Sequence, residues 1–373
     1  MRHLTNKEEQ RGGMEIFMNT ITISLGEHSY PIFLEEDFSH IGRVMRERGL
    51  HQRLLVVTEP NIKDLYEAPL RRELEAAGFE VNLCEIAGGE ENKNLETVRG
   101  IYREMMNLRF DRSCTVVALG GGIVGDIAGF AAATFLRGVP FVQVPTTLLA
   151  QVDSSVGGKV GVNFNGVKNI VGAFYQPALV YINSKTLNTL TERDYKTGLG
   201  EVVKYAVLDG EPFYDFLSSH AGDLRRADVI RHCCEIKAEI VQQDERENGL
   251  RAVLNLGHTF GHAYETATHH AITHGEGVAS GLVSACELAC LMGLLERETA
   301  DRIKELLDKL GLTYILPPCG GIMEAMQGDK KRLDGRLRFV LPHAMGDVQI
   351  HEAPQELVEQ AIRVVLPEKD GRI

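Results

Sequence analysis

The chain has 373 residues, of which 25% are charged and 44% hydrophobic, a composition typical of a globular protein with a large core. Acidic residues outnumber basic residues 52 to 40, and the net charge of −12 argues against nucleic acid or an anionic membrane surface as the main partner. The seven cysteines form no CxxC pair, which favours reduced thiols in a cytoplasmic protein over a disulfide framework.

The first half of the chain alternates strand-like and helix-like segments. Residues 1–18 lack the apolar core of a signal peptide and are expected to be a disordered extension. The segment TITISLGEHSYPIFLE alternates around a Gly-Glu-His turn, which predicts a β-hairpin. Strands are then predicted at 54–58, 81–86, 115–119 and 141–144, and helices at 62–77, 94–108 and 123–135. This alternation predicts an α/β fold with a doubly wound, mostly parallel sheet.

The pattern changes near residues 183–185, where helical periodicity begins to dominate. Helices are predicted at 193–208, 212–218, 228–244, 277–292 and 299–310, followed by an alternating segment RLRFVLP and a last helix near 355–365. We therefore expect a nucleotide-binding α/β domain at 19–183 and a mainly helical domain at 184–373. A ligand should lie in the crevice between them.

A glycine-rich loop at 120–125, GGGIVG, stands between a predicted strand and a predicted helix. This context can place a pyrophosphate on a helix N-terminus, although glycine-rich turns of this kind are common without a nucleotide. A standard Rossmann arrangement is disfavoured because no Asp or Glu occurs between residues 127 and 152 to hold the ribose. Glu59 at a strand end and the polar loop 88–93 could hold a dinucleotide instead. Asp126 is either a helix-start acid or a ligand contact.

The stretch 251–276 is predicted to be a helix with an unusual polar stripe. At about 100° per residue, one face carries Arg251, Asn255, His258, His262 and Glu265. Such spacing normally belongs to an apolar stripe, so these side chains indicate an active-site wall rather than a surface helix that happens to carry histidines. Two histidines four residues apart can hold one metal ion, or one can hold the metal while the other does acid–base work.

Further basic residues occur in glycine-rich loops or inside apolar helical stripes. They are Arg137, Lys159, Lys168, Lys204, Lys237 and Arg251. A lysine at the edge of an apolar stripe can extend its ammonium group to water, or it can point into a pocket. As a set, these cations suit a small, multiply anionic substrate such as a phosphorylated carboxylate. Glu201 would supply the carboxylate that a bis-histidine metal site lacks.

Six segments stand in order along the chain: GGGIVGDIAGFAAATFLRG, VPTTLLAQVDSSVGGKVGVN, KNIVGAFYQP, GLGEVVKYA, DERENGLRAVLNLGHTFGHAYE and HGEGVASG. With them, the chain resembles the 3-dehydroquinate synthase family over about residues 20–345. The resemblance implies a cytoplasmic, homodimeric lyase of the shikimate pathway, which supplies chorismate and aromatic amino acids. Such an enzyme uses NAD and one divalent metal, Zn²⁺ or Co²⁺. It converts 3-deoxy-D-arabino-heptulosonate 7-phosphate to 3-dehydroquinate and phosphate by transient oxidation, phosphate elimination, re-reduction, ring opening and aldol closure.

The resemblance also implies residue roles, matched motif by motif. The metal ligands would be Glu201, His258 and His274. Substrate contacts would be Arg137, Asp153, Lys159, Asn169, Lys204, Lys237, Arg251, Asn255 and His262, with Arg137 reaching the phosphate site of the neighbouring subunit. Cofactor contacts would be Glu59, Asn61, Glu90, Lys93, Gly121, Gly122, Asp126, Thr146, Thr147, Lys159, Lys168, Thr186 and Leu190. Lys330 or Lys331 would close over the substrate.

Three other interpretations stay open. A sister sugar-phosphate cyclase of the 2-epi-5-epi-valiolone or 2-deoxy-scyllo-inosose synthase type would share the fold, NAD and metal, but the cations and amides favour a carboxylate-bearing substrate. A metal-dependent glycerol or alcohol dehydrogenase would release reduced cofactor and would need fewer cations. A non-catalytic nucleotide or metal sensor would explain the glycine loop and histidines, but it would leave the lysines in apolar stripes without a role. No nucleic-acid or membrane partner is expected.

Overall fold

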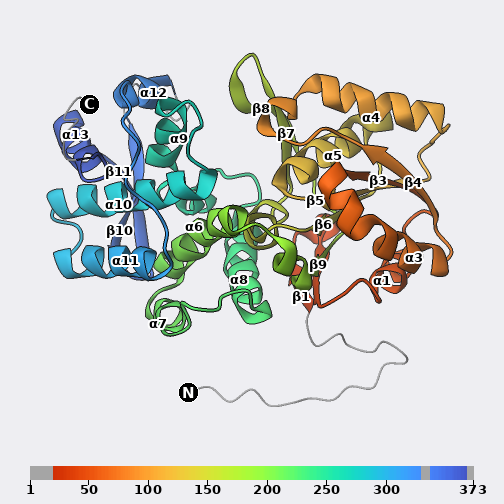
Figure 1. The fold of residues 1–373 in the computed structure, drawn as a ribbon, viewed down its shortest axis with the longest axis horizontal. Coiled ribbons are helices and arrows are strands. Elements are labelled where there is room, and N and C mark those ends of the chain that lie inside the picture. The colour runs from red at the N-terminus through yellow and green to blue at the C-terminus, as the bar shows by residue number, and fades with distance from the viewer. Residues whose placement is uncertain (1–19, 329–336, 368–373) are drawn as a thin grey trace.

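The computed structural model describes residues 20–328 and 337–367. Figure 1 shows a sheet-containing half, formed by the first part of the chain, beside a helical half formed by the later part. Within the described ranges, no helix is long and apolar enough to cross a membrane. The predicted extension at 1–18 and the two lysines, Lys330 and Lys331, lie outside the described residues.

The first half is built on a seven-stranded sheet with the strand order β1-β2-β9-β6-β5-β3-β4. Its strands are β1 (Thr20–Ile23), β2 (Tyr30–Glu35), β3 (Arg53–Thr58), β4 (Glu80–Glu85), β5 (Cys114–Gly120), β6 (Phe141–Pro145) and β9 (Leu179–Asn183). β1 and β2 form an antiparallel hairpin, and all other neighbours in this sheet are parallel. The predicted hairpin and the mostly parallel sheet are therefore confirmed.

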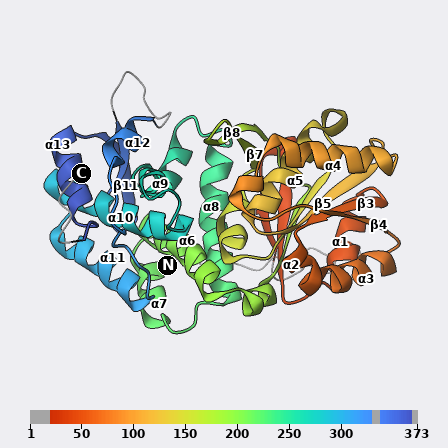
Figure 2. The ribbon, with the colours of Figure 1, turned by 45° about the horizontal axis from the view of Figure 1, so that its top comes forward.

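Helices cover both faces of this sheet (Figure 2). They are α1 (Ile41–Glu47), α2 (Pro60–Ile62), α3 (Ala68–Ala76), α4 (Leu95–Asn107) and α5 (Gly122–Thr134). Along β3, Leu54 packs in the cluster that includes α1 and α3, while Leu55 packs in the cluster that includes α4 and α5. Because both faces of the central strands are buried, these strands appear in the sequence as continuous apolar runs. The predicted helix at 62–77 contains a π-helical turn at Lys63–Glu67.

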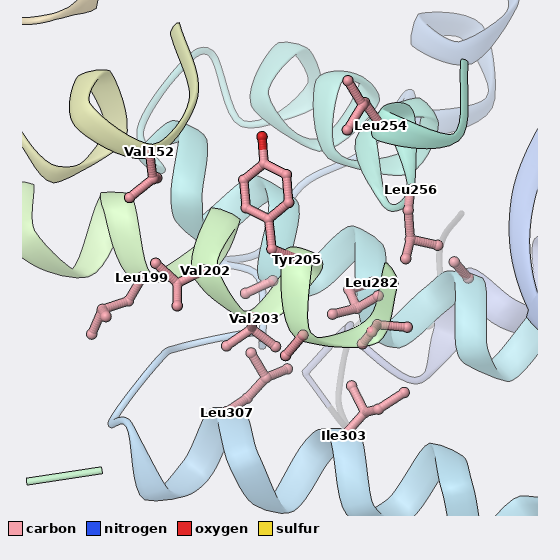
Figure 3. Packing of buried hydrophobic residues seen from close by; sticks show 14 of the residues in the cluster. Val152, Leu199, Val202, Val203, Tyr205, Leu254, Leu256, Leu282, Ile303 and Leu307 are labelled. Carbon is pink, nitrogen blue, oxygen red and sulfur yellow. The ribbon is translucent and has the colours of Figure 1, made fainter. Parts of the chain in front are cut away.

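The second half is mainly helical. Its elements are α6 (Glu192–Asp209), α7 (Glu211–Ser219), α8 (Ala227–Gln243), α9 (His258–Ala267), α10 (His274–Leu291), α11 (Arg297–Lys309), α12 (Ile322–Gly328), α13 (Gln355–Arg363) and the hairpin of β10 (Arg338–Ala344) and β11 (Asp347–Glu352). Figure 3 shows Val203 of α6 beside Ile303 and Leu307 of α11, while the Tyr205 hydroxyl points to the other side of α6.

One apolar cluster continues across the predicted domain boundary. It contains Ile32 of β2 and Ile182 of β9 together with Val203 of α6 and Val241 of α8. Figure 2 shows α8 between the sheet and α9 to α13 of the second half. The division near residues 183–185 agrees with where the sheet ends and the helices begin, and we retain it as a proposal.

Two parts of the sequence interpretation need correction. The predicted single helix over 251–276 is wrong: the chain forms a 3₁₀ segment at Leu250–Asn255, then α9, and then the start of α10. The break occurs at Gly257, whose φ of +77° is strained for residues with a side chain. The antiparallel hairpin of β7 (Lys159–Phe164) and β8 (Val167–Phe174) was not predicted. Glycine and charged residues in both strands hide the alternation of a buried strand.

Candidate active site and metal centre

A cavity of about 560 Å³ lies between the two halves and is lined by residues from both. The hairpin β7–β8 and residues 153–156 form one wall, and α6, α8, α9 and the start of α10 form the other. The sequence-predicted residues that line it are Asp126, Asp153, Lys159, Asn169, Lys204, Lys237, Arg251, Asn255, His258, His262 and His274. The structure therefore has a cavity in the crevice where the sequence predicted a ligand.

A candidate metal cluster includes two residues that line this cavity, His258 and His274. Single ligand atoms of Glu201, His258 and His274 all lie within 4.8 Å of one another. Glu201 comes from α6 and its side chain is fully buried. Its Oε1 lies 3.3 Å from His258 Nε2 and 3.1 Å from His274 Nε2. His274 is the first residue of α10, where a capping box between Thr273 and Glu276 fixes the start of the helix.

Hydrogen bonds at Nδ1 fix the orientation of both imidazole rings. His258 Nδ1 donates to the backbone carbonyl of Leu256 at 3.1 Å, and His274 Nδ1 donates to Glu265 Oε1 at 2.9 Å. Since both acceptors are oxygens without a proton, each Nδ1 must carry the hydrogen, and each Nε2 faces Glu201. One carboxylate and two such imidazoles beside a cavity form the ligand set that a catalytic zinc ion needs.

The charges around Glu201 agree with a site for a cation. Burial alone would raise the pKa of Glu201, but Lys204 and His258 lower it well below its usual range. Burial lowers the pKa of His258 despite the neighbouring carboxylate of Glu201. Burial also opposes protonation of His274, yet hydrogen bonds to Glu201 and Glu265 raise its pKa to about 10. The negative charge that Glu201 and Glu265 place on both sides of His274 also favours a divalent ion at this position.

A second set of possible ligand atoms belongs to His262, Glu265 and His274. It is less suited to a metal ion because the Nδ1 hydrogen of His274 already binds Glu265, and the ammonium of Lys168 lies 2.7 Å from Glu265 Oε2. His258 and His262 do not share a cluster among the described residues. The pairing suggested by their four-residue spacing is therefore not supported, and the set with Glu201 fits a metal better.

The lysines in apolar stripes point into the cavity. Lys237 Nζ lies 2.9 Å from Asp153 Oδ1, and Lys204 Nζ lies 3.6 Å from the same oxygen and 2.5 Å from Glu201 Oε2. Tyr205 donates its hydroxyl to Asp153 Oδ1 at 2.5 Å. Burial would raise the pKa of Asp153, but the two ammonium groups lower it. Burial, together with the like charges of Lys204 and Arg251, lowers the pKa of Lys237 to about 8 despite Asp153.

The cavity also holds a second group of charged residues. Arg251 is only 2% exposed and donates to the carbonyl of Gly157 at 3.0 Å. Lys159 forms an ion pair with Glu247, and Asn255 Nδ2 donates to Glu247 Oε1 at 2.6 Å. Glu247 was not predicted as a site residue, because in the polar run DEREN nothing separates it from its acidic neighbours. Its φ of +57° marks a constrained backbone position, but this is seen only in the structure.

The predicted cofactor residues mostly lie along the carboxyl ends of the parallel strands. Glu59 follows β3, the glycine loop joins β5 to α5, and Thr146 follows β6 and donates its backbone N–H to Gly120 at 3.0 Å. A Cβ on Gly121 would lie 3.2 Å from the Thr147 side chain, so the loop has little room for larger residues. This edge of a parallel sheet is where open α/β folds bind ligands.

The other predicted cofactor residues extend from this edge. Asn61 lies in α2, Glu90 lies in the 3₁₀ turn after β4, and Thr186 and Leu190 lie in and just after the 3₁₀ segment that follows β9. Lys93 is buried and bridges Asp126 and Asn169, with Nζ–O distances of 2.5 and 2.6 Å. Asp126 therefore faces a cation and lines the cavity. It is not an isolated helix-start acid.

Arg137 is the predicted substrate contact that the structure does not bring to the cavity. It is exposed, with a φ of +71°, and follows Leu136, whose φ is +50°. Two consecutive residues with side chains in this backbone region are costly, and such strain is concentrated at functional positions. Arg137 is not among the residues that line the cavity of its own chain.

Comparison with known sequences identifies close relatives. A family model described as 3-dehydroquinate synthase N-terminal matches residues 83–197, and one described as 3-dehydroquinate synthase C-terminal matches residues 198–332. The 3-dehydroquinate synthase of Acetivibrio thermocellus is 44% identical over 355 residues, covering 92% of this chain and 99% of the relative. That of Geotalea uraniireducens is 46% identical over 357 residues, covering 93% and 99%.

Comparison with solved structures gives two close folds. A 2-deoxy-scyllo-inosose synthase complexed with carbaglucose-6-phosphate, NAD⁺ and Co²⁺ has a TM-score of 0.83 at 26% identity and covers 93% of this chain and all of its own. A 2-epi-5-epi-valiolone synthase from Streptomyces hygroscopicus subsp. jinggangensis with NAD⁺ and Zn²⁺ bound has a TM-score of 0.84 at 28% identity, covering 92% and 98%. A probable glycerol dehydrogenase from Sinorhizobium meliloti, at 15% identity and a TM-score of 0.60, shares the fold alone.

Proposed function

The chain belongs to the 3-dehydroquinate synthase family, and from this premise we propose that it converts 3-deoxy-D-arabino-heptulosonate 7-phosphate to 3-dehydroquinate and phosphate. This reaction is a carbon–oxygen lyase step in the shikimate pathway, which leads to aromatic amino acids. The observation that carries the proposal is one cavity lined by His258, His274, Lys204, Lys237 and Arg251. It combines a metal cluster with the positive charge that a phosphorylated carboxylate requires.

The proposed cofactors are NAD and one divalent ion, Zn²⁺ or Co²⁺. They are supported by the ligand set of Glu201, His258 and His274, and by the two cyclases of similar fold that have NAD⁺ and Co²⁺ or Zn²⁺ bound. When bound, NAD supplies reversible hydride transfer, and the metal polarises the substrate oxygen that is oxidised. We assign the cofactor to the carboxyl edge of the sheet, beside the glycine loop and Glu59.

The chain's own residues bind and orient the substrate in this mechanism. Lys204 and Lys237 present ammonium groups toward the cavity, and Asp153 holds both in place. Their buried positions strengthen the attraction for an anion because little water screens it. Arg251, fixed by backbone carbonyls, offers a planar group suited to a carboxylate or phosphate. His262 faces the same cavity and is the proposed proton relay.

The substrate carboxylate separates this proposal from the sister cyclases. Sedoheptulose 7-phosphate and glucose 6-phosphate carry no carboxylate, so those cyclases need charge only at the phosphate. Here the cations form two groups, one around Asp153 and one around Glu247. Several cations in one cavity suit a substrate that carries a carboxylate as well as a phosphate.

A homodimer in the cytoplasm completes the proposal. Arg137 is exposed and held in a strained loop, and two apolar side chains of the hairpin β7–β8 that do not line the cavity, Phe164 and Val167, are 47% and 45% exposed. An exposed apolar surface beside the cavity suits a second copy of the chain, from which Arg137 would reach the phosphate. A cytoplasmic location is supported by the seven cysteines, all of which are free.

The test is phosphate release from 3-deoxy-D-arabino-heptulosonate 7-phosphate, measured with NAD and Zn²⁺ before and after chelation. The absorbance of NADH is followed in the same sample. Release that requires both NAD and metal, without accumulation of NADH, supports the proposal. Release only from a sugar phosphate without a carboxylate would assign the chain to the sister cyclases. Accumulating NADH without phosphate release would make it a dehydrogenase.

A further inference from the structure

Glu265 is a buried carboxylate next to the candidate metal cluster. Its residue is 4% exposed and its side chain contacts two different parts of the molecule. Oε1 accepts from His274 Nδ1 at 2.9 Å, on the ring edge opposite Glu201, and Oε2 lies 2.7 Å from Lys168 Nζ. His274 is thus held between two carboxylates, one at each nitrogen.

The packing of α9 on α10 determines this contact. A Cβ on Gly277 would lie 3.3 Å from Glu265 Cγ and 3.4 Å from Glu265 Oε1. A Cβ on Gly261 would lie 2.8 Å from the carbonyl oxygen of Gly277. The Glu265 side chain therefore extends over a glycine toward the first residue of α10, and the close approach of the helices leaves it little freedom.

We propose that Glu265 is a positioning residue for the metal: it fixes His274 so that Nε2 faces Glu201 and His258, and it is itself fixed by Lys168. A carboxylate that accepts from the outer nitrogen of a metal-bound imidazole fixes the ring orientation and makes the ligand nitrogen more basic. His258 obtains the same orientation from the carbonyl of Leu256, but that acceptor carries no full charge. Glu265 is therefore the partner that also increases the electron density on the ligand.

The contact with Lys168 extends this role to the hairpin. Lys168 lies in β8, 97 residues away in sequence, and is a proposed cofactor contact. The Lys168 ammonium neutralises part of the Glu265 charge and keeps Oε1 directed at His274. Because of this ion pair, Glu265 is poorly suited to bind the metal directly. The inference rests on the metal site of the proposed function.

The experiment measures Zn²⁺ and Co²⁺ affinity of the metal-free protein by competition with a chromophoric chelator, without NAD or substrate. Glu265→Gln retains an oxygen that accepts from His274 but loses the charge, and Glu265→Ala loses both. We expect affinity to fall in the order wild type, Gln, Ala, with a total loss of about 10- to 100-fold. The Co²⁺ absorption bands and the one-to-one stoichiometry should be retained.

Two further variants separate the alternatives. Lys168→Met leaves the His274 contact in place and should reduce metal affinity less than Glu265→Ala. Glu239→Gln, an exposed acid on α8, removes one charge away from the site and should change nothing. Circular dichroism confirms that each variant is folded.

The outcomes are distinct. Equal Zn²⁺ and Co²⁺ affinity in the wild type and both Glu265 variants would overturn the inference. It would not contradict the proposed metal site. A larger loss of metal affinity in Lys168→Met than in Glu265→Ala would also overturn it, because Lys168 would then act on the metal site by a route other than Glu265. Loss of stoichiometric binding with altered Co²⁺ bands in Glu265→Ala would make Glu265 a ligand. Failure of the wild-type chain to bind either ion would instead contradict the proposed function.

Discussion

Gly281 of α10 lies directly against Gly257, the residue that precedes α9. A Cβ at position 281 would be 2.0 Å from the carbonyl oxygen of Gly257. This contact brings the two helices close enough for His258 and His274 to face one carboxylate, with ring centroids 5.3 Å apart. The candidate metal cluster therefore depends on positions without side chains as much as on its proposed ligands.

The first prediction concerns this contact. Gly281→Ala adds a methyl group where backbone atoms already stand, so the helices must separate. We expect a loss of about 1–3 kcal/mol in the free energy of unfolding, which is typical of overpacked interiors. We also expect a loss of Zn²⁺ affinity, because His258 and His274 move apart. Urea unfolding and chelator competition measure the two effects.

Gly100→Ala is the matched control for this variant. Gly100 lies within α4, and a Cβ there would meet nothing within 4 Å. The change should stabilise the protein by about 0.5–1 kcal/mol, the usual difference between alanine and glycine in a helix. Unchanged metal affinity in Gly281→Ala would show that the helix contact does not set the ligand geometry.

A second prediction follows from the ion pair of Lys204 with Glu201. The Lys204 side chain is 1% exposed and that of Glu201 is fully buried, so Lys204→Met leaves a buried carboxylate without its nearest cation. We expect the metal-free protein to lose about 3–5 kcal/mol of unfolding free energy. Saturating Zn²⁺ should recover part of this loss, because the ion supplies the missing charge beside Glu201.

Urea unfolding with and without Zn²⁺ measures both values for Lys204→Met. Lys196→Met, on the partly exposed side of the same helix, should change the stability by no more than about 0.5 kcal/mol. An equal loss in Lys204→Met with and without the metal would contradict a cation site at Glu201.

The strands and helices of the first half could be predicted because their buried positions carry apolar residues in a regular pattern. Val56 and Val57 face opposite cores, so β3 needs apolar residues at every position. The hairpin β7–β8 could not be found in this way. Lys159 and Lys168 interrupt the apolar alternation of these strands because each forms an ion pair with a residue of the second half, Glu247 and Glu265 respectively.

The site was partly predictable for a similar reason. Lys204 and Lys237 could be suspected because charged residues rarely occupy apolar stripes. The placement of Arg251 and Asn255 with His258 was expected from helical spacing, yet it results from a 3₁₀ segment and a turn at Gly257. No sequence pattern indicated that Glu247 belongs to the site. Its place there depends on an ion pair with Lys159, which lies in a distant strand. Contacts of this kind become visible only in three dimensions.

A third prediction concerns pH and Lys237, whose pKa burial lowers to about 8. An anionic substrate favours the protonated ammonium, so binding should weaken as pH rises above about 8. The lowered pKa of Lys237 affects the free energy of unfolding in the opposite direction: this group adds stability as pH rises. The unfolded chain retains this proton up to its ordinary pKa of 10.5, so the unfolded state binds more protons between about pH 8 and 10.5, and this group adds stability as pH rises there.

Calorimetric titration of substrate into metal-free, NAD-free protein at several pH values measures the binding effect. Lys237→Arg retains its charge throughout this range and should shift the decline in affinity to higher pH. The same decline in Lys237→Arg as in the wild type would show that another group controls binding.

The last prediction tests whether Arg137 acts in the neighbouring subunit. Arg137→Ala and His258→Ala should each nearly abolish phosphate release, the first through the substrate phosphate and the second through the metal. In a mixed dimer, the subunit with Arg137→Ala retains its metal ligands and receives Arg137 from its partner, so one complete site is restored. If subunits mix at random, about one quarter of the wild-type activity should return. Activity that stays absent after unfolding and refolding the two variants together, with dimers present by sedimentation, would place Arg137 in the cavity of its own chain or outside the site.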